Sequence, residues 1–245
     1  MKNLTTRKLV IVAMLGAITV VLGLTPLGFI PIGPLNATTM HIPVILAAIL
    51  EGPIVGALVG LIFGLSSLFN AITRPTPISI VFYNPLISIL PRILIGLIAY
   101  YIYRAVRDID GGILRKIALA AWVLIFAFLA YGIVRAIPQG FSISMGVNIA
   151  LAILVAILFV LLLRYKTENV SVMVSAFLTT ICHSIMVMGG IYFLYAEEFI
   201  RGVGADIAMA RSVIFSVIIT SGVPEGIIAV IICTAVVSAV LKSNN

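Results

Sequence analysis

The sequence has very few charged residues. Only 9% of its 245 residues are Asp, Glu, Lys or Arg, whereas 62% are hydrophobic, and the mean hydropathy is +1.29. A soluble domain of this length needs far more polar residues to cover its surface. The composition therefore excludes a soluble globular protein and predicts an integral membrane protein.

Cysteine and histidine are also scarce. Cys182 and Cys233 lie inside apolar segments, so no disulfide framework is expected and both are interpreted as small packing residues. His41 and His183 are the only histidines, and they form no His-Glu-x-x-His or comparable metal motif. We therefore expect no metal site and no cofactor.

Recognisable catalytic motifs are missing. No Gly-x-x-x-x-Gly-Lys-Ser/Thr loop occurs, which excludes ATP hydrolysis by a P-loop. Glu197, Glu198 and Arg201 resemble part of an intramembrane protease motif but fall in an expected outer loop with no downstream histidine. The sequence offers no base that would activate Ser66 or Ser67 as a nucleophile. The sequence thus predicts no catalytic residues and favours a protein that is not an enzyme.

Long apolar runs separated by short polar stretches predict membrane-spanning α-helices, because barrel strands would alternate over about ten residues. The first run follows basic residues, as in a signal peptide, but no small-residue cleavage site follows it, so it is interpreted as a retained helix. The second run has roughly 12 residues, or about 18 Å, and spans only if the preceding loop enters the membrane. The expected helices are 8–24, 40–51, 53–72, 78–103, 117–134, 146–163, 170–195 and 212–241.

The basic residues favour one orientation. With a cytoplasmic N-terminus, the outer side holds only four: Arg74, Arg135, Arg201 and Arg211. The inner side then holds ten: Lys2, Arg7, Lys8, Arg104, Arg107, Arg115, Lys116, Arg164, Lys166 and Lys242. Because Lys and Arg concentrate in cytoplasmic loops, both termini are predicted to be cytoplasmic. Basic residues in cytoplasmic loops thus account for the net charge of +7, and no binding of nucleic acid is needed to explain it.

The segment from Pro26 to Ser67 is the most informative one. Its first part, PLGFIPIGPLNATTMHIP, is an uncharged loop rich in Pro and Gly, too apolar for a solvated connector, and is predicted to be a lid on the outer side. The helix that follows carries glycines four residues apart at 52, 56, 60 and 64. That spacing places them on one helix face, where another helix can approach closely.

Polar residues recur every four positions in three later helices, which predicts one wet face on each. They are Asn84, Ser88 and Arg92; Ser175, Thr179 and His183; and Ser212, Ser216 and Thr220, with Ser221 and Glu225 on an adjoining stripe. Together with the glycine-bearing helix, these faces are expected to enclose one polar cavity. The helices 117–134 and 146–163 have almost no polar residues and are expected to face lipid.

Three ionisable residues are expected at a common depth. Arg92, His183 and Glu225 each lie about 18 to 21 Å from the outer end of their helix. A charge at that depth costs at least roughly 2.5 kcal/mol, so each should face a partner or a cavity. Two interpretations remain open: a structural Arg92–Glu225 pair, or a ligand carboxylate near Arg92 or His183.

Several stretches resemble the substrate-binding S components of energy-coupling factor (ECF) vitamin transporters, closest to the pantothenate-type members. They are LGFIPI, TTMHIPVILAAILEGPIVGALVGLIFGLSSL, FYNPLISILPRILIGLIAYYIYR and GVPEGIIAVII. The resemblance covers about 9–105 and 170–241. It implies a six-helix core, at about 8–105 and 170–241 of a single membrane domain (1–245), whose outer loop closes over a bound vitamin.

The resemblance also implies partners: a transmembrane coupling subunit, docked at Ala13 and Ala17, and two ATPase subunits. It implies that this chain lies in the plasma membrane of a prokaryote. Two departures stand out. About fifty extra residues between Arg107 and Asn169 predict an inserted apolar helix pair (about 113–166), making about eight spans. Cys182 and His183 stand where an Asn-Thr pair is expected, which leaves the identity of the vitamin open.

The sequence therefore favours a high-affinity S component of an ATP-driven ECF importer for a vitamin or related molecule, with pantothenate the closest candidate. The alternative is a self-sufficient, proton-coupled secondary transporter that uses Arg92, His183 and Glu225 as a relay. The candidate substrate-binding residues are Asn36, Thr38, Thr39, His41, Ser67, Asn70, Tyr83, Asn84, Ser88, Arg92, His183 and Glu225.

Overall fold

The computed structural model describes residues 5–32, 35–139, 143–164 and 167–243. Within them, seven helices are long and apolar enough to cross a membrane, and α2 is shorter. The α-helices are α1 (Thr6–Leu24), α2 (Ile42–Glu51), α3 (Pro53–Thr73), α4 (Pro85–Ser88), α5 (Leu90–Arg107), α6 (Gly111–Ala136), α7 (Ile143–Arg164), α8 (Thr167–Val203) and α9 (Ala210–Ser243). Between them lie the strands β1 (Phe29–Ile32) and β2 (Leu35–Thr38) and the 3-10 turns η1 (Pro26–Gly28), η2 (Ser79–Tyr83), η3 (Ile137–Gln139) and η4 (Ile207–Met209).

The predicted fold class, an all-α integral membrane protein, is confirmed, and most helices begin and end close to the expected residues. The continuous helix expected over 78–103 is wrong. The chain there forms η2, α4 and α5 in succession. Pro85 and Pro91 have no N–H to continue a helix from the preceding residues, and the side chain of Asn84 caps α4 by accepting from the Leu86 N–H at 2.9 Å.

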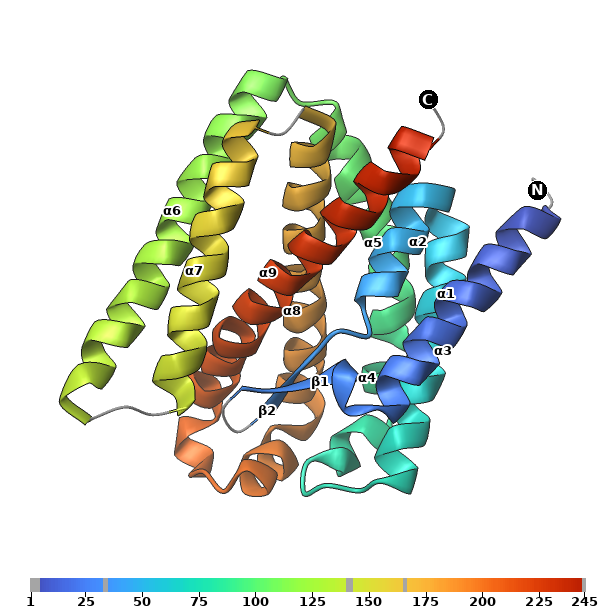
Figure 1. The fold of residues 1–245 in the computed structure, drawn as a ribbon. Coiled ribbons are helices and arrows are strands. Elements are labelled where there is room, and N and C mark those ends of the chain that lie inside the picture. Colours follow the sequence, from blue (N-terminus) through green and yellow to red (C-terminus); the bar gives the residue numbers. More distant parts are fainter. Residues whose placement is uncertain (1–4, 33–34, 140–142, 165–166, 244–245) are drawn as a thin grey trace.

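The helices pack in a consistent order. α8 packs against α9, α3 packs against both α1 and α5, and α2 contacts α3 and α5. Figure 1 shows the pair α6–α7 on one outer side of the molecule and both chain ends at the same end of the bundle. Only 17% and 22% of the apolar windows of α6 and α7 are buried, against 61% for α8. The pair is thus exposed on the outside of the bundle, as a lipid-facing position requires, whereas its contact with lipid and its origin as an insertion stay predictions.

The glycines of α3 allow its backbone to touch α5. A Cβ added at Gly60 would lie 2.0 Å from the carbonyl oxygen of Arg92, and one added at Gly56 would lie 2.7 Å from that of Gly96. Gly64 is equally close to the Cα of Ile89, at 2.7 Å. Gly52 has a different role, because its φ of 102° forms the turn between α2 and α3. The glycine stripe thus joins two helices of the same chain.

The outer loop folds into a small antiparallel hairpin of β1 and β2, with Phe29 paired to Thr38. The chain turns sharply between the end of α1 and β1, since a Cβ on Gly28 would lie 2.1 Å from the Leu22 carbonyl oxygen. Figure 1 shows the hairpin running across the bundle near α8 and α9, and β2 contacts α9. The loop therefore enters the bundle, as the short α2 required.

We predict that Gly60→Ala lowers the stability of the protein by about 1 to 3 kcal/mol, because the new Cβ would overlap the carbonyl of Arg92. Thermal unfolding of the purified chain in detergent measures the loss. Gly189→Ala on α8 is the matched control, since nothing lies within 4 Å of its added Cβ. Equal melting temperatures for the two variants would show that α3 and α5 are not in backbone contact.

Candidate functional site

A cavity of about 110 Å³ lies between the helices, next to Thr38 at the end of the hairpin. Its polar lining comes from four elements, through Thr38, Arg92, His183 with Ser184, and Ser221 with Glu225. The rest of the lining is apolar: Ile78, Phe82, Val187, Met188, Ile191, Phe199 and Val217. The cavity is smaller than the roughly 300 to 1,000 Å³ of typical small-molecule pockets, so a ligand requires the lining to move.

Glu225 reaches this cavity because α9 approaches α8 closely on both sides of it. A Cβ added at Gly222 would lie 3.1 Å from the hydroxyl of Ser184, and one at Gly226 would lie 2.7 Å from the Phe177 ring. The two glycines are four residues apart and share a helix face. The carboxylate is consequently buried, with a relative exposure of 7%.

The hairpin is attached to this carboxylate. The backbone N–H of Thr38 donates to Oε1 of Glu225 at 2.7 Å, across 187 positions of sequence. This distance is short for a bond from a backbone N–H. The predicted lid is therefore held down by a direct bond to α9.

Arg92 lies in the same cavity without forming the ion pair that the sequence left open. The ion pairs among the described residues join other side chains, and Arg92 is not one of them. Its guanidinium instead donates to the carbonyl oxygen of Ile87 and lies 5.3 and 5.6 Å from the ring centres of Phe63 and Phe82. Cation–π contacts offset part of the cost of burying this charge, and its Nε has no hydrogen-bond partner.

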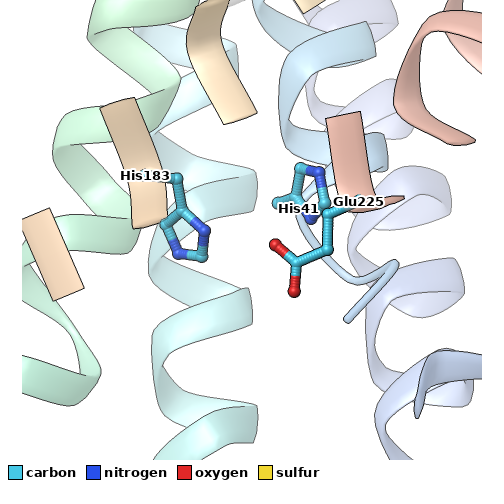
Figure 2. A group of neighbouring side chains, drawn as sticks. All are labelled: His41, His183 and Glu225. Atoms are coloured by element: carbon cyan, nitrogen blue, oxygen red, sulfur yellow. The ribbon is translucent and has the colours of Figure 1, made fainter. Parts of the chain in front are cut away.

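Two histidines meet next to Glu225. The rings of His41 and His183 are stacked with centroids 5.7 Å apart, and their ligating atoms and that of Glu225 all lie within 4.8 Å of one another. Figure 2 shows the three side chains gathered around a common space. Both ring nitrogens of His183 and the Nδ1 of His41 are buried without a hydrogen-bond partner.

The structure brings only part of the predicted set together. Thr38, Arg92, His183 and Glu225 line the cavity, and His41 lies against them. Asn36 belongs to β2, but its side chain lies outside the described part of the chain. The remaining residues do not line this cavity: Thr39, Ser67, Asn70, Tyr83, Asn84 and Ser88.

Several of these side chains have structural partners instead. Asn70 and Thr39 bond to backbone carbonyls of the α1 end and the turn after it. Asn84 donates to the hydroxyl of Tyr195 at 3.2 Å, and Ser88 donates back to the Asn84 carbonyl at 3.0 Å. Tyr83 is 46% exposed. Their role as ligand contacts stays a prediction, now without support from their positions.

The expected wet face of α9 is wrong. Ser212, Ser216 and Thr220 are exposed on the outside of the bundle, and each hydroxyl donates to a carbonyl three or four residues earlier. A hydroxyl satisfied within its own helix needs no polar surroundings. The adjoining stripe of Ser221 and Glu225 faces the cavity.

The sequence pattern did not indicate the apolar wall or Ser184 of the lining. Met188 and Phe199 carry no pattern that distinguishes a cavity wall from ordinary core, so no signal was available for them. Ser184 could have been found, since it follows His183 on α8, and Ser221 was recognised only as part of a stripe.

A bundle of apolar helices long enough to cross a membrane, with a small cavity between them, fits a membrane protein that holds a small solute. The chain matches the family "ECF transporter, substrate-specific component" over residues 7–240, and it belongs to this family. It is thus a multi-pass membrane protein and a transport component, and its family is not one of enzymes.

Two relatives are named as transporters of one vitamin. "Pantothenate transporter PanT" of Leuconostoc mesenteroides subsp. mesenteroides is 40% identical over 104 residues, covering 40% of this chain and 51% of the relative. "Pantothenic acid transporter PanT" of Lactococcus lactis subsp. cremoris is 32% identical over 117 residues, covering 40% of this chain and 60% of the relative. The chain thus spans about half to three fifths of their lengths. Both relatives are bacterial, which indicates the plasma membrane.

We predict that Glu225→Leu releases the hairpin, because the Thr38 N–H loses its acceptor. Hydrogen exchange at the Thr38 amide should accelerate about tenfold to a hundredfold, as expected for a lost hydrogen bond to a charged group.

The matched control is Glu51→Leu, which removes a carboxylate paired with Arg7 at the opposite end of α2 from the hairpin. Unchanged exchange at Thr38 in the Glu225 variant would mean that the hairpin is held by other contacts.

Proposed function

We propose that this chain is the high-affinity substrate-binding subunit of an ATP-driven ECF importer and that its ligand is pantothenate or a closely related carboxylate. The observation that carries the proposal is the buried guanidinium of Arg92 in a cavity that Thr38 of the hairpin helps to line. The names of the two relatives support the choice of vitamin.

The chemistry of the lining suits such a molecule. Pantothenate has a carboxylate, an amide, two hydroxyls and an apolar dimethyl group. The guanidinium of Arg92, with an unpartnered Nε, is a donor for the carboxylate. Ser184, Ser221 and His183 offer hydrogen bonds to the hydroxyls and amide, and the wall around Met188 and Phe199 suits the methyl groups.

The hairpin acts as the gate in this proposal. The cavity of about 110 Å³ is too small for a vitamin, so entry requires the hairpin to lift and the lining to spread. Breaking the bond between Thr38 and Glu225 is the first step of opening. A ligand that restores equivalent contacts closes the gate again.

The proposed orientation follows the basic residues, with both termini in the cytoplasm and the hairpin outside. The ten inner basic residues include Lys2 and Lys166, which lie outside the described residues. Ala13 and Ala17 are exposed on α1, where small side chains permit close approach of a partner helix. The proposed partners are the coupling subunit, docked there, and two ATPase subunits that supply the energy.

We predict that Arg92→Gln weakens pantothenate binding by about tenfold to a hundredfold, the scale of a lost hydrogen bond to a charged group. Isothermal titration of the purified protein measures the affinity. The alcohol analogue of pantothenate, in which CH₂OH replaces the carboxylate, should bind the wild type more weakly than pantothenate does. Arg92→Gln should lower the affinity for this analogue only a little further.

Ser212→Ala, on the outer face of α9, is the control and should bind pantothenate like the wild type. If Arg92→Gln weakens both ligands equally, Arg92 maintains the fold of the cavity and does not recognise the carboxylate.

We predict that Ala13→Trp and Ala17→Trp leave pantothenate affinity unchanged but prevent co-purification with the coupling subunit, because the indole blocks helix approach. Ala127→Trp, at an exposed position of α6, is the control and should still co-purify.

Uptake separates this proposal from the proton-coupled alternative. Cells that lack the coupling and ATPase subunits should take up no pantothenate through this chain. Uptake that persists there and is abolished by an uncoupler would favour the relay of Arg92, His183 and Glu225 instead.

A further inference from the structure

The side chains of His41, His183 and Glu225 gather metal-ligating atoms from three separate parts of the chain. His41 precedes α2, His183 lies on α8 and Glu225 lies on α9. All three are buried, with relative exposures of 0%, 5% and 7%. Their ligating atoms lie within 4.8 Å of one another, and Figure 2 shows the three side chains around one space.

His41 has one hydrogen-bonded ring nitrogen. The Thr180 hydroxyl donates its single proton to the Ala176 carbonyl at 2.9 Å, so it can accept from Nε2–H of His41, 3.1 Å away. In that tautomer Nδ1 carries a lone pair, and Nδ1 is buried without a partner of hydrogen-bond geometry. Ligating histidines in metal sites are typically fixed in this way, through a hydrogen bond from the other ring nitrogen. The Thr38 backbone lies close to the ring and favours the other tautomer, so a metal ion at Nδ1 must displace that contact.

His183 and Glu225 complete the set. Both ring nitrogens of His183 are buried and unpartnered, which is costly for a polar group in an apolar interior. The Thr38 N–H occupies and orients Oε1 of Glu225, as outer-shell donors do for ligating carboxylates, and Arg92 is not paired with Glu225. The guanidinium still acts electrostatically on Glu225 and on His183, so a cation bound here must compete with it for the carboxylate.

The geometry points to a binding site for one divalent transition-metal ion, with His41, His183 and Glu225 as its ligands. Two imidazoles and one carboxylate suit zinc and leave a fourth tetrahedral position open. At metal–ligand distances of about 2.0 to 2.2 Å, tetrahedral ligand atoms are about 3.4 Å apart. Because the ligating atoms lie up to 4.8 Å apart, the three groups must draw together by up to about 1.4 Å to bind the ion. No sequence motif indicated this site, because 142 and 42 positions separate its members (183 − 41 and 225 − 183).

The inference does not depend on the proposed transport function, and its test uses metal alone. The purified full chain in detergent is stripped with a chelator and titrated with Co²⁺ and then Zn²⁺. We expect one ion per chain, with visible Co²⁺ absorption of a tetrahedral site and no thiolate charge-transfer band. His41→Ala, His183→Ala and Glu225→Gln should each weaken zinc affinity by at least about a hundredfold, more than loss of an outer-shell partner.

Cys182→Ala is the matched control, because this thiol precedes His183 on α8 and is partly accessible, yet is not among the proposed ligands. It should bind zinc like the wild type. Glu225→Gln also serves as a folding control, since its amide oxygen still accepts from Thr38 N–H. In chelator it should unfold at the wild-type temperature, whereas zinc should raise the unfolding temperature only in proteins that bind it.

Two results would overturn the inference. One is a wild-type chain that binds no stoichiometric Co²⁺ or Zn²⁺ after stripping. The other is zinc affinity in His183→Ala and Glu225→Gln equal to that of Cys182→Ala.

Discussion

The backbone contact between α3 and α5 is the constraint on which the rest of the site depends. Gly60 leaves room for the carbonyl of Arg92, and Gly56 faces Gly96 one turn further along. No larger residue fits at such distances without moving a helix. The contact fixes the height of Arg92 in the bundle and brings Phe63 of α3 against its guanidinium. A second pair of glycines, on either side of Glu225, leaves room for the side chains of Ser184 and Phe177 of α8.

Burial of charge explains why the hairpin lies inside the bundle. Arg92 and Glu225 act on each other electrostatically but form no ion pair, so each also needs other stabilising contacts. Arg92 uses a carbonyl and two aromatic faces. Glu225 uses the backbone of the hairpin itself. The gate is thus part of the electrostatic environment of the cavity, and any solute that reaches Arg92 must also change what surrounds Glu225.

Much of the fold followed from apolar runs and their breakers, because a helix in lipid must satisfy its own backbone and has a minimum length. The break at Asn84 was missed because polar residues four apart were interpreted as one helix, although Pro85 and Pro91 interrupt it. The hydroxyl groups of α9 led to a wrong prediction of a wet face. The Ser216 hydroxyl donates to a carbonyl of its own helix, so a polar side chain there does not indicate polar surroundings.

The site was less accessible to sequence reasoning than the fold. Periodicity places residues on a common face but does not say which face points inward, and it says nothing of contacts between distant segments. The approach of His41 to His183 and the bond from Thr38 to Glu225 are of this second kind. Both contacts form only when the loop before α2 folds into the bundle. The absence of charge in this loop indicates that it enters the bundle, but does not indicate which residues it contacts there.

Whether the cavity beside Thr38 holds a small carboxylate can be seen in an experimental structure of the protein saturated with pantothenate. We expect ligand density between Arg92 and Glu225, with the carboxylate on the guanidinium and the hairpin closed over it. Density at another place, such as the groove near Arg7 and Glu51, or a vacant cavity at saturating pantothenate, would contradict this expectation.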